Sequence, residues 1–123
     1  MKLYFLVALF GAAGTLLRYS IYKITPNFFI SNFPVATLAV NLVGSFLIGF
    51  FIALYEKNLI DNSLRYVLTY GFLGGFTTFS TFSMDMFNLI NKSLYFYASF
   101  YILSSVILGL VFFVIGKKTA TFF

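Results

Sequence analysis

The stretch that decides the fold is residues 71–83, Gly71-Phe72-Leu73-Gly74-Gly75-Phe76-Thr77-Thr78-Phe79-Ser80-Thr81-Phe82-Ser83. It lies within an apolar segment, residues 64–90, that is longer than one straight crossing of a bilayer requires. Adjacent glycines and β-branched threonines weaken a helix. Non-helical backbone at membrane depth persists only where it is buried in protein or faces a water-filled path. The sequence therefore predicts a transmembrane helix that is broken in mid-membrane at residues 74–78.

The composition of the whole chain is that of a membrane protein. Of its 123 residues, 61% are hydrophobic and only 9% are charged, whereas soluble domains carry about 25% charged residues. A spanning helix needs roughly 20 apolar residues, so four spans fit with short connections. No alternation of apolar and polar residues indicates a barrel. We expect an all-α membrane protein, one domain over residues 1–123, with helical spans at 3–22, 34–55, 64–90 and 94–115.

The charged and reactive residues exclude several functions. The net charge is +5, but the basic residues are scattered near the ends of the spans, unlike the clustered basic face that binds nucleic acid. The chain has no cysteine and no histidine, so disulfides, thiolate chemistry and imidazole metal sites are excluded. No nucleophile and base stand at a usable spacing, so we expect no enzymatic activity. One side of the membrane would hold Lys2, Lys57, Arg65, Lys117 and Lys118, and the other Arg18, Lys23 and Lys92, a bias too weak to fix one orientation.

A break in the third span would expose backbone groups with two kinds of chemistry. Loose carbonyls can hold a cation, and the N–H groups of a fresh helix N-terminus favour an anion. The alternative is that the glycines only allow close helix packing and the hydroxyls bond back to their own helix. Hydroxyl groups occur at Thr77, Thr78, Ser80, Thr81 and Ser83, directly after the glycine pair. Since packing does not need so many, the combination favours a functional break.

Two further spans carry polar stripes with a spacing of four residues. The second span has Thr37, Asn41, Ser45 and Gly49, and the fourth has Tyr97, Tyr101, Ser105 and Gly109. Either stripe alone is compatible with a packing seam between helices. Asn41 favours a path, because a side-chain amide can donate hydrogen bonds to an anion that a carboxylate would repel. Together the stripes predict a hydroxyl-lined path.

Arg18 and Asp85 are charged residues near the ends of the first and third spans. Each would be costly if it were buried without a partner. We therefore expect each to lie at the interface, or to pair with an opposite charge or a carbonyl, and to serve folding. A vestibule role for Arg18 stays open.

Three motifs, at residues 11–19 (GAAGTLLRY), 41–49 (NLVGSFLIG) and 71–83, together resemble the fluoride-channel family written CrcB or Fluc. Their order and spacing match the family over nearly the whole chain, and the third motif is the specific one. The resemblance implies a passive fluoride exporter in the cell membrane. It also implies an antiparallel, dual-topology homodimer in the lipid bilayer, with two fluoride pores and a structural sodium ion (Na+) at its centre, and no small-molecule cofactor.

The resemblance assigns roles to individual residues. Sodium would be held by the backbone carbonyls of Gly74 and Thr77 from both subunits. The residues lining the fluoride pore would be the phenylalanines Phe79 and Phe82 and the donors Asn41, Thr37, Ser80, Thr81, Tyr101 and Ser105. Arg18 matches the arginine of the family's first span. Two positions depart from the family pattern: Asp85 stands where glutamate is more usual, and Gly109 where some members have serine.

Three alternatives remain at this stage. A small multidrug-type exporter has a similar size, but it needs a membrane-embedded carboxylate, and residues 3–22 contain no acidic residue. A non-transporting membrane scaffold would explain the packing stripes but not the hydroxyl-rich break. Met1-Lys2 and Gly11-Ala12-Ala13 also fit a cleaved signal peptide. The apolar run continues to Leu17, however, and this favours a first span.

Overall fold

The computed structural model describes residues 1–25 and 33–123, and its regular elements are all helical within these ranges. Three helices are long and apolar enough to cross a membrane: α1 (Lys2–Ile24), α2 (Val35–Glu56) and α6 (Tyr95–Thr119), which ends in a short 3-10 turn, η2 (Ala120–Phe122). The remaining span is the third. The all-α, four-span fold predicted from sequence is thus confirmed, with boundaries that shift by at most a few residues. The connection between the first two spans falls mainly on residues 26–32, outside the described ranges.

The third span is built from four pieces: α3 (Asn62–Tyr66), the π-helix η1 (Val67–Leu73), α4 (Gly74–Phe76) and α5 (Phe79–Asn91). It begins where the Asp61 side chain accepts a hydrogen bond from the backbone N–H of Leu64, at 2.9 Å. Helical structure stops at Thr77 and Thr78, whose backbones are extended (ψ 160° and 120°). The predicted mid-span break is therefore present, but Gly74 and Gly75 themselves remain helical.

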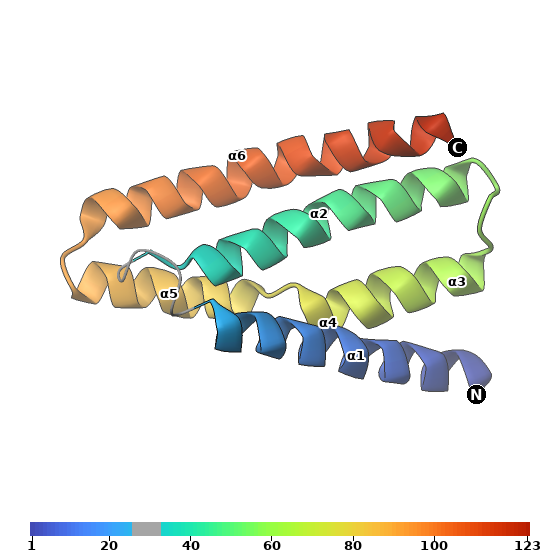
Figure 1. Ribbon diagram of the computed structural model, residues 1–123, viewed down its shortest axis with the longest axis horizontal. Coiled ribbons are helices and arrows are strands. Elements are labelled where there is room, and N and C mark those ends of the chain that lie inside the picture. The colour runs from blue at the N-terminus through green and yellow to red at the C-terminus, as the bar shows by residue number, and fades with distance from the viewer. Residues whose placement is uncertain (26–32) are drawn as a thin grey trace.

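The spans lie side by side in the order α6, α2, third span, α1 (Figure 1). The N-terminus, the C-terminus and the α2–α3 connection share one end of the molecule. α2 packs along α6, whereas α1 packs on η1 and α4, the half of the third span that precedes the break. α5 packs on α6 instead. The break therefore marks the point where the third span changes its main neighbour.

Glycines bring α1 unusually close to the third span. A Cβ atom on Gly75 would lie 2.2 Å from the carbonyl oxygen of Gly11, and one on Gly14 would lie 2.1 Å from the carbonyl oxygen of Phe72. Either contact is far shorter than van der Waals distance, so only glycine fits, as in other close helix pairs in membranes. A Cβ atom on Gly74 would meet nothing closer than 3.8 Å. The packing explanation therefore holds for Gly75, and it does not hold for Gly74.

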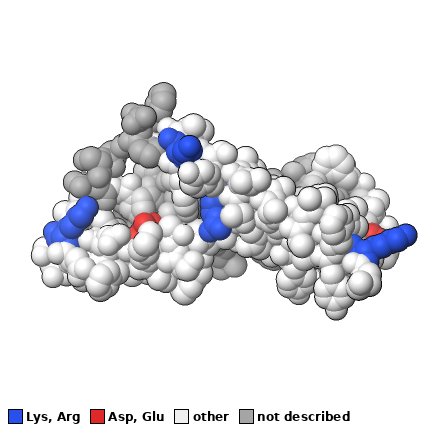
Figure 2. All heavy atoms as spheres, turned by 90° about the horizontal axis from the view of Figure 1, so that it is seen from below, with Lys and Arg blue, Asp and Glu red and all other residues white. Residues whose placement is uncertain are grey.

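The surface of the described chain is mostly apolar. Large side chains such as Leu16, Phe96, Val106 and Leu110 are exposed. The face in Figure 2 is largely white, with lysine and arginine in separate spots. Such a surface suits lipid and helix contacts better than water. The chain is a multi-span membrane protein.

Candidate functional site: the helix break and its polar surroundings

Asn41 of α2 holds the break by pairing with the peptide groups of Thr78. Its Oδ1 accepts from the Thr78 N–H at 2.8 Å, and its Nδ2 donates to the Thr78 carbonyl at 3.0 Å. These two bonds replace partners that the interrupted helix can no longer supply, which apolar surroundings require. One N–H of the amide is left over. The assignment of Asn41 to an anion path stays a prediction, and in the structure two of its hydrogen bonds go to the backbone of Thr78.

Thr78 ends the break and starts α5. Its Oγ1 accepts from the Thr81 N–H at 3.1 Å, which is the usual N-cap bond of a helix, and lies 3.0 Å from Thr81 Oγ1 and 3.3 Å from Ser80 Oγ. The hydroxyls of Ser80 and Thr81 therefore form a small network around the cap. Ser83 bonds back to the carbonyl of Phe79 at 3.1 Å. Part of the hydroxyl cluster thus serves the helix itself.

The carbonyls of Gly74 and Thr77 both lose their regular helical donors. In a continuous α-helix the Gly74 carbonyl would accept from the N–H of Thr78, four residues later. That N–H donates to Asn41, and the corresponding donor for Thr77, the N–H of Thr81, donates to the Thr78 side chain. The oxygens named from sequence as cation ligands are thus two that the break deprives of their regular donors.

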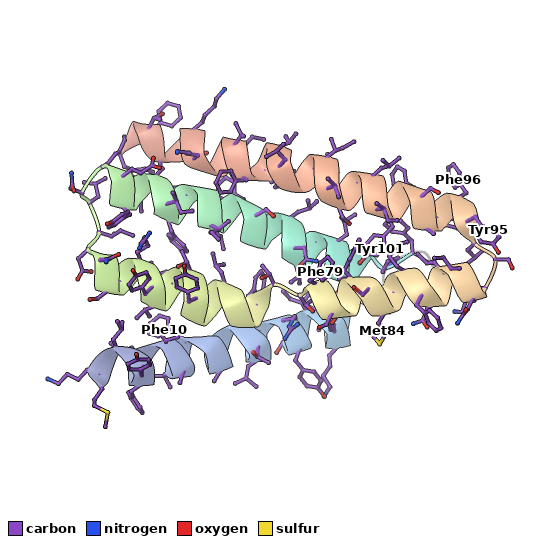
Figure 3. All side chains as sticks on the ribbon, turned by 180° about the vertical axis from the view of Figure 1, so that it is seen from behind. Phe10, Phe79, Met84, Tyr95, Phe96 and Tyr101 are labelled. Carbon is purple, nitrogen blue, oxygen red and sulfur yellow. The ribbon has the colours of Figure 1, made fainter. Side chains whose placement is uncertain are left out.

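A groove runs along the break between α2 and the third span. Its volume is about 440 Å³, and it is lined by Asn41, Gly44, Ser45, Ile48, Thr69, Leu73, Gly74, Thr77, Thr78 and Phe79. Gly44 makes room for the third span, because a Cβ atom there would lie 2.1 Å from the Thr77 methyl group. Phe79 stands at the start of α5 with its side chain 79% exposed (Figure 3). The groove and the exposed Phe79 therefore lie on the same open face of the described chain.

Asp85 on α5 accepts hydrogen bonds from hydroxyls of two other spans. Thr37 Oγ1 donates to Asp85 Oδ2 at 2.7 Å, and Tyr101 Oη donates to the same oxygen at 3.3 Å. Tyr22 Oη in turn donates to Thr37 Oγ1 at 3.3 Å. No cation of the described residues lies within 4.0 Å of this carboxylate. The sequence left Asp85 at the interface or paired with an opposite charge or a carbonyl, and among the described residues its partners are side-chain hydroxyls of α2 and α6. Its role in folding stays a prediction.

Aromatic rings close this cluster. The ring of Phe82 lies 5.0 Å from that of Tyr101 and 5.6 Å from that of Phe79, centroid to centroid. Tyr101 is fully buried and reaches from α6 toward α5 (Figure 3). One turn further along α6, Ser105 Oγ is buried and has no hydrogen-bond partner among the described residues. The structure thus brings Phe82, Tyr101, Thr37 and Asp85 together around α5.

Other residues singled out from the sequence lie apart. Arg18, on α1, is partly exposed, and no side-chain hydrogen bond joins it to a described residue. Gly49 on α2 packs against α6, where a Cβ atom would lie 2.1 Å from the Phe113 carbonyl. The second-span stripe therefore serves the break at one end and helix packing at the other. Sequence reasoning missed the contact of Tyr22 with Thr37 and the cap role of Thr78.

Comparison with known proteins agrees with this architecture. The family described as "CrcB-like protein, Camphor Resistance (CrcB)" matches residues 5–117. A relative from Aquifex aeolicus is 44% identical over 119 residues, covering 94% of both chains, and one from Geobacter sulfurreducens is 46% identical over 110 residues, covering 85% of this chain and 86% of its own. Another, from Hydrogenobaculum sp., is 40% identical over 116 residues and 93% of both chains. All three are called "Fluoride-specific ion channel FluC". The chain belongs to the CrcB-like family, as its three motifs indicated.

Proposed function

We propose that this chain is a fluoride-selective channel, which lowers cytoplasmic fluoride by letting the ion leave down its electrochemical gradient. Family membership and relatives named as fluoride-specific ion channels support this reading. Fluoride is small and strongly hydrated, so a selective path must replace its water with hydroxyl and amide donors. The positive edges of phenyl rings can add to those donors. Neither a covalent step nor a co-transported ion is needed.

The observation that carries the proposal is the convergence of Thr37 and Tyr101 on one anionic oxygen. Both hydroxyls donate to Oδ2 of Asp85, at 2.7 and 3.3 Å. Both hydroxyls are therefore oriented toward an anionic acceptor, and because each has one proton, fluoride would have to pass beside Asp85 and take these donors over from it. Phe82 borders the same space, 5.0 Å from the Tyr101 ring. The path would extend on either side of this space along Asn41, Ser80, Thr81, Ser105 and Phe79.

We also propose that two antiparallel copies complete the channel and hold sodium between them. The carbonyls of Gly74 and Thr77 fit such a site, since both lose their regular helical donors and oxygen ligands suit a hard cation. Gly74 is exposed on the open groove of a single chain, where a second copy would supply the remaining oxygens. Bound there, the cation would offset part of the cost of bringing an anion into a low dielectric.

Flux measurements test the proposed activity. The purified protein is placed in liposomes that are loaded with the potassium salts of fluoride and chloride, and valinomycin is added to clamp the voltage. Fluoride should leave these vesicles and chloride should stay. The Phe82→Ile variant keeps an apolar side chain but removes the ring. Vesicles with this variant should release fluoride more slowly than vesicles with the unmodified protein. Equal loss of both ions, or loss of neither, would contradict the proposal.

Thiol labelling tests the antiparallel assembly separately. The chain has no cysteine, so a Leu59→Cys variant carries a single reporter in the exposed α2–α3 connection. In intact cells, a membrane-impermeant maleimide should label only part of these thiols from outside. The rest should react after permeabilisation. Complete labelling, or none, before permeabilisation would mean a single orientation.

A further inference from the structure

A second, smaller cavity lies next to the groove, toward the α2–α3 end of the molecule. It measures about 130 Å³ and is lined by Ile48, Ile52, Arg65, Thr69 and Tyr70. Ile48 and Thr69 also line the groove at the break, so the two hollows adjoin along the seam between α2 and the third span. The end of the molecule that holds α3 also holds both termini (Figure 1). The cavity is thus placed between one membrane boundary and the groove.

Arg65 brings a positive charge to this cavity in a fixed position. Its guanidinium carbon lies 4.3 Å from the ring centroid of Tyr55 and 4.7 Å from that of Tyr66, and Nη2 donates to Asn62 Oδ1 at 2.7 Å. Stacking on two rings and a neutral acceptor orient the guanidinium without neutralising it. By contrast, the Lys117 ammonium lies 2.9 Å from the carboxylate of Glu56.

The Arg65 guanidinium also has an unused donor. Its Nε atom is buried and has no hydrogen-bond acceptor among the described residues. A buried N–H group without an acceptor is costly, more so when it carries charge. No carboxylate of the described residues lies within 4.0 Å of this guanidinium. The charge therefore calls for an anionic acceptor, which would meet the guanidinium at its terminal N–H groups, because an atom as buried as Nε leaves no room for an ion beside it.

The size of the cavity limits what that acceptor is. Water occupies about 30 Å³ per molecule in the liquid, so about 130 Å³ accommodates an ion with a few waters. A halide fits, and the phosphate of a lipid headgroup offers the same charge chemistry at this depth. Arg65 precedes Gly74 by nine positions, roughly 14 Å along a helix, so an anion held here would stand at the approach to the groove.

We infer that Arg65 and its cavity form an anion-capture site, from which fluoride passes along the seam of α2 and the third span toward the break. The inference rests on the proposed channel function and extends it to the mouth of the path. In an antiparallel pair, each membrane face would have one such site. Positive charge at a narrow mouth raises the local anion concentration and the rate of capture. Arg65 should therefore matter most when fluoride is scarce.

Fluoride flux as a function of fluoride concentration tests the capture site. The variants are Arg65→Gln, Arg65→Lys, which keeps the charge, and the matched control Lys118→Gln, which removes an exposed charge at the same end. At low fluoride, Arg65→Gln should reduce the initial rate roughly 10-fold, the lower limit of electrostatic steering. At saturating fluoride its rate should approach that of the unmodified protein. Arg65→Lys should retain most of the rate, and Lys118→Gln should stay close to the unmodified protein at both concentrations.

Three results would overturn the capture site. Arg65→Gln could match Lys118→Gln at low fluoride, which would make the charge unimportant. It could lose the same fraction of the rate at every fluoride concentration, as expected if Arg65 serves folding or holds a lipid phosphate. Its defect could also be unchanged when the ionic strength rises, whereas a steering effect must weaken. Absence of fluoride flux in the unmodified protein would instead refute the channel function itself.

Discussion

Replacing Asn41 with alanine removes both hydrogen bonds that hold the break in the third span. Asn41 accepts from the Thr78 N–H at 2.8 Å and donates to the Thr78 carbonyl at 3.0 Å. Each hydrogen bond contributes about 0.5–1.5 kcal/mol to stability, so two give about 1–3 kcal/mol. Side-chain hydrogen bonds measured in a membrane protein average about 0.6 kcal/mol, which supports the lower half of that range. We expect Asn41→Ala to lower the free energy of unfolding by about 1–3 kcal/mol.

Unfolding in mixed micelles, with SDS as denaturant, measures this change. Asn88→Ala is the matched control, because Asn88 is an exposed asparagine on the same span and no side-chain hydrogen bond joins it to a described residue. Asn41→Asp should lower the free energy of unfolding more than Asn41→Ala does. It keeps the acceptor for the Thr78 N–H, but it places a carboxylate oxygen next to the Thr78 carbonyl oxygen, and the two repel each other. Fluoride efflux should fall in both Asn41 variants.

The reasoning about the break would be refuted by an Asn41→Ala protein that unfolds like Asn88→Ala and releases fluoride at the original rate. Loss of efflux without loss of stability would mean that Asn41 acts on the ion through its remaining N–H, and not as a support for the backbone. Loss of stability with normal efflux would mean that the break is not needed for conduction.

Four further changes test the packing and the path. Gly75→Ala should lower the free energy of unfolding by about 1–3 kcal/mol, because the new Cβ would lie 2.2 Å from the Gly11 oxygen. Gly74→Ala should change the free energy of unfolding of a monomer in the same micelles by less than about 0.5 kcal/mol, because the nearest atom to the new Cβ, the Thr69 oxygen, is 3.8 Å away. Phe82→Ile should slow fluoride efflux strongly while size-exclusion chromatography still shows the assembled dimer. Tyr101→Phe keeps the ring but removes one donor, so efflux should fall and stability should drop by about 1 kcal/mol in micelles. Unchanged values for Gly75→Ala, Phe82→Ile or Tyr101→Phe would contradict the reason given for that change, and so would a Gly74→Ala protein as unstable as Gly75→Ala.

The sequence predicted the break because its causes are local. Glycine, threonine and serine follow one another within residues 71–83, and both the composition and the excess length of the span indicate an interruption. The exact site was less predictable. Gly74 and Gly75 are helical, since Gly75 is held against Gly11 of α1, and the interruption moves to Thr77 and Thr78. The π-helix at Val67–Leu73 carried no local signal that we recognised.

The partners of the polar residues could not be predicted, because they come from distant parts of the chain. Thr37 precedes Asp85 by 48 positions, and Asn41 precedes Thr78 by 37. Periodicity shows which residues share a face, but the neighbour of that face depends on how the spans cross. For Asp85 the sequence left open the interface, an opposite charge or a carbonyl, and it could not identify the hydroxyls of Thr37 and Tyr101, which come from two other spans.

The most direct measurement is the reversal potential of the current through the protein in a planar bilayer. Fluoride is set tenfold higher on one side, chloride is equal on both sides, and an impermeant anion balances the charge. A fluoride-selective channel should reverse at the equilibrium potential of fluoride, about 59 mV from zero for a tenfold gradient of a monovalent ion. Reversal well below this value would show that chloride also carries current, and reversal near zero would show that chloride carries nearly all of it. Either result would contradict a fluoride-selective path.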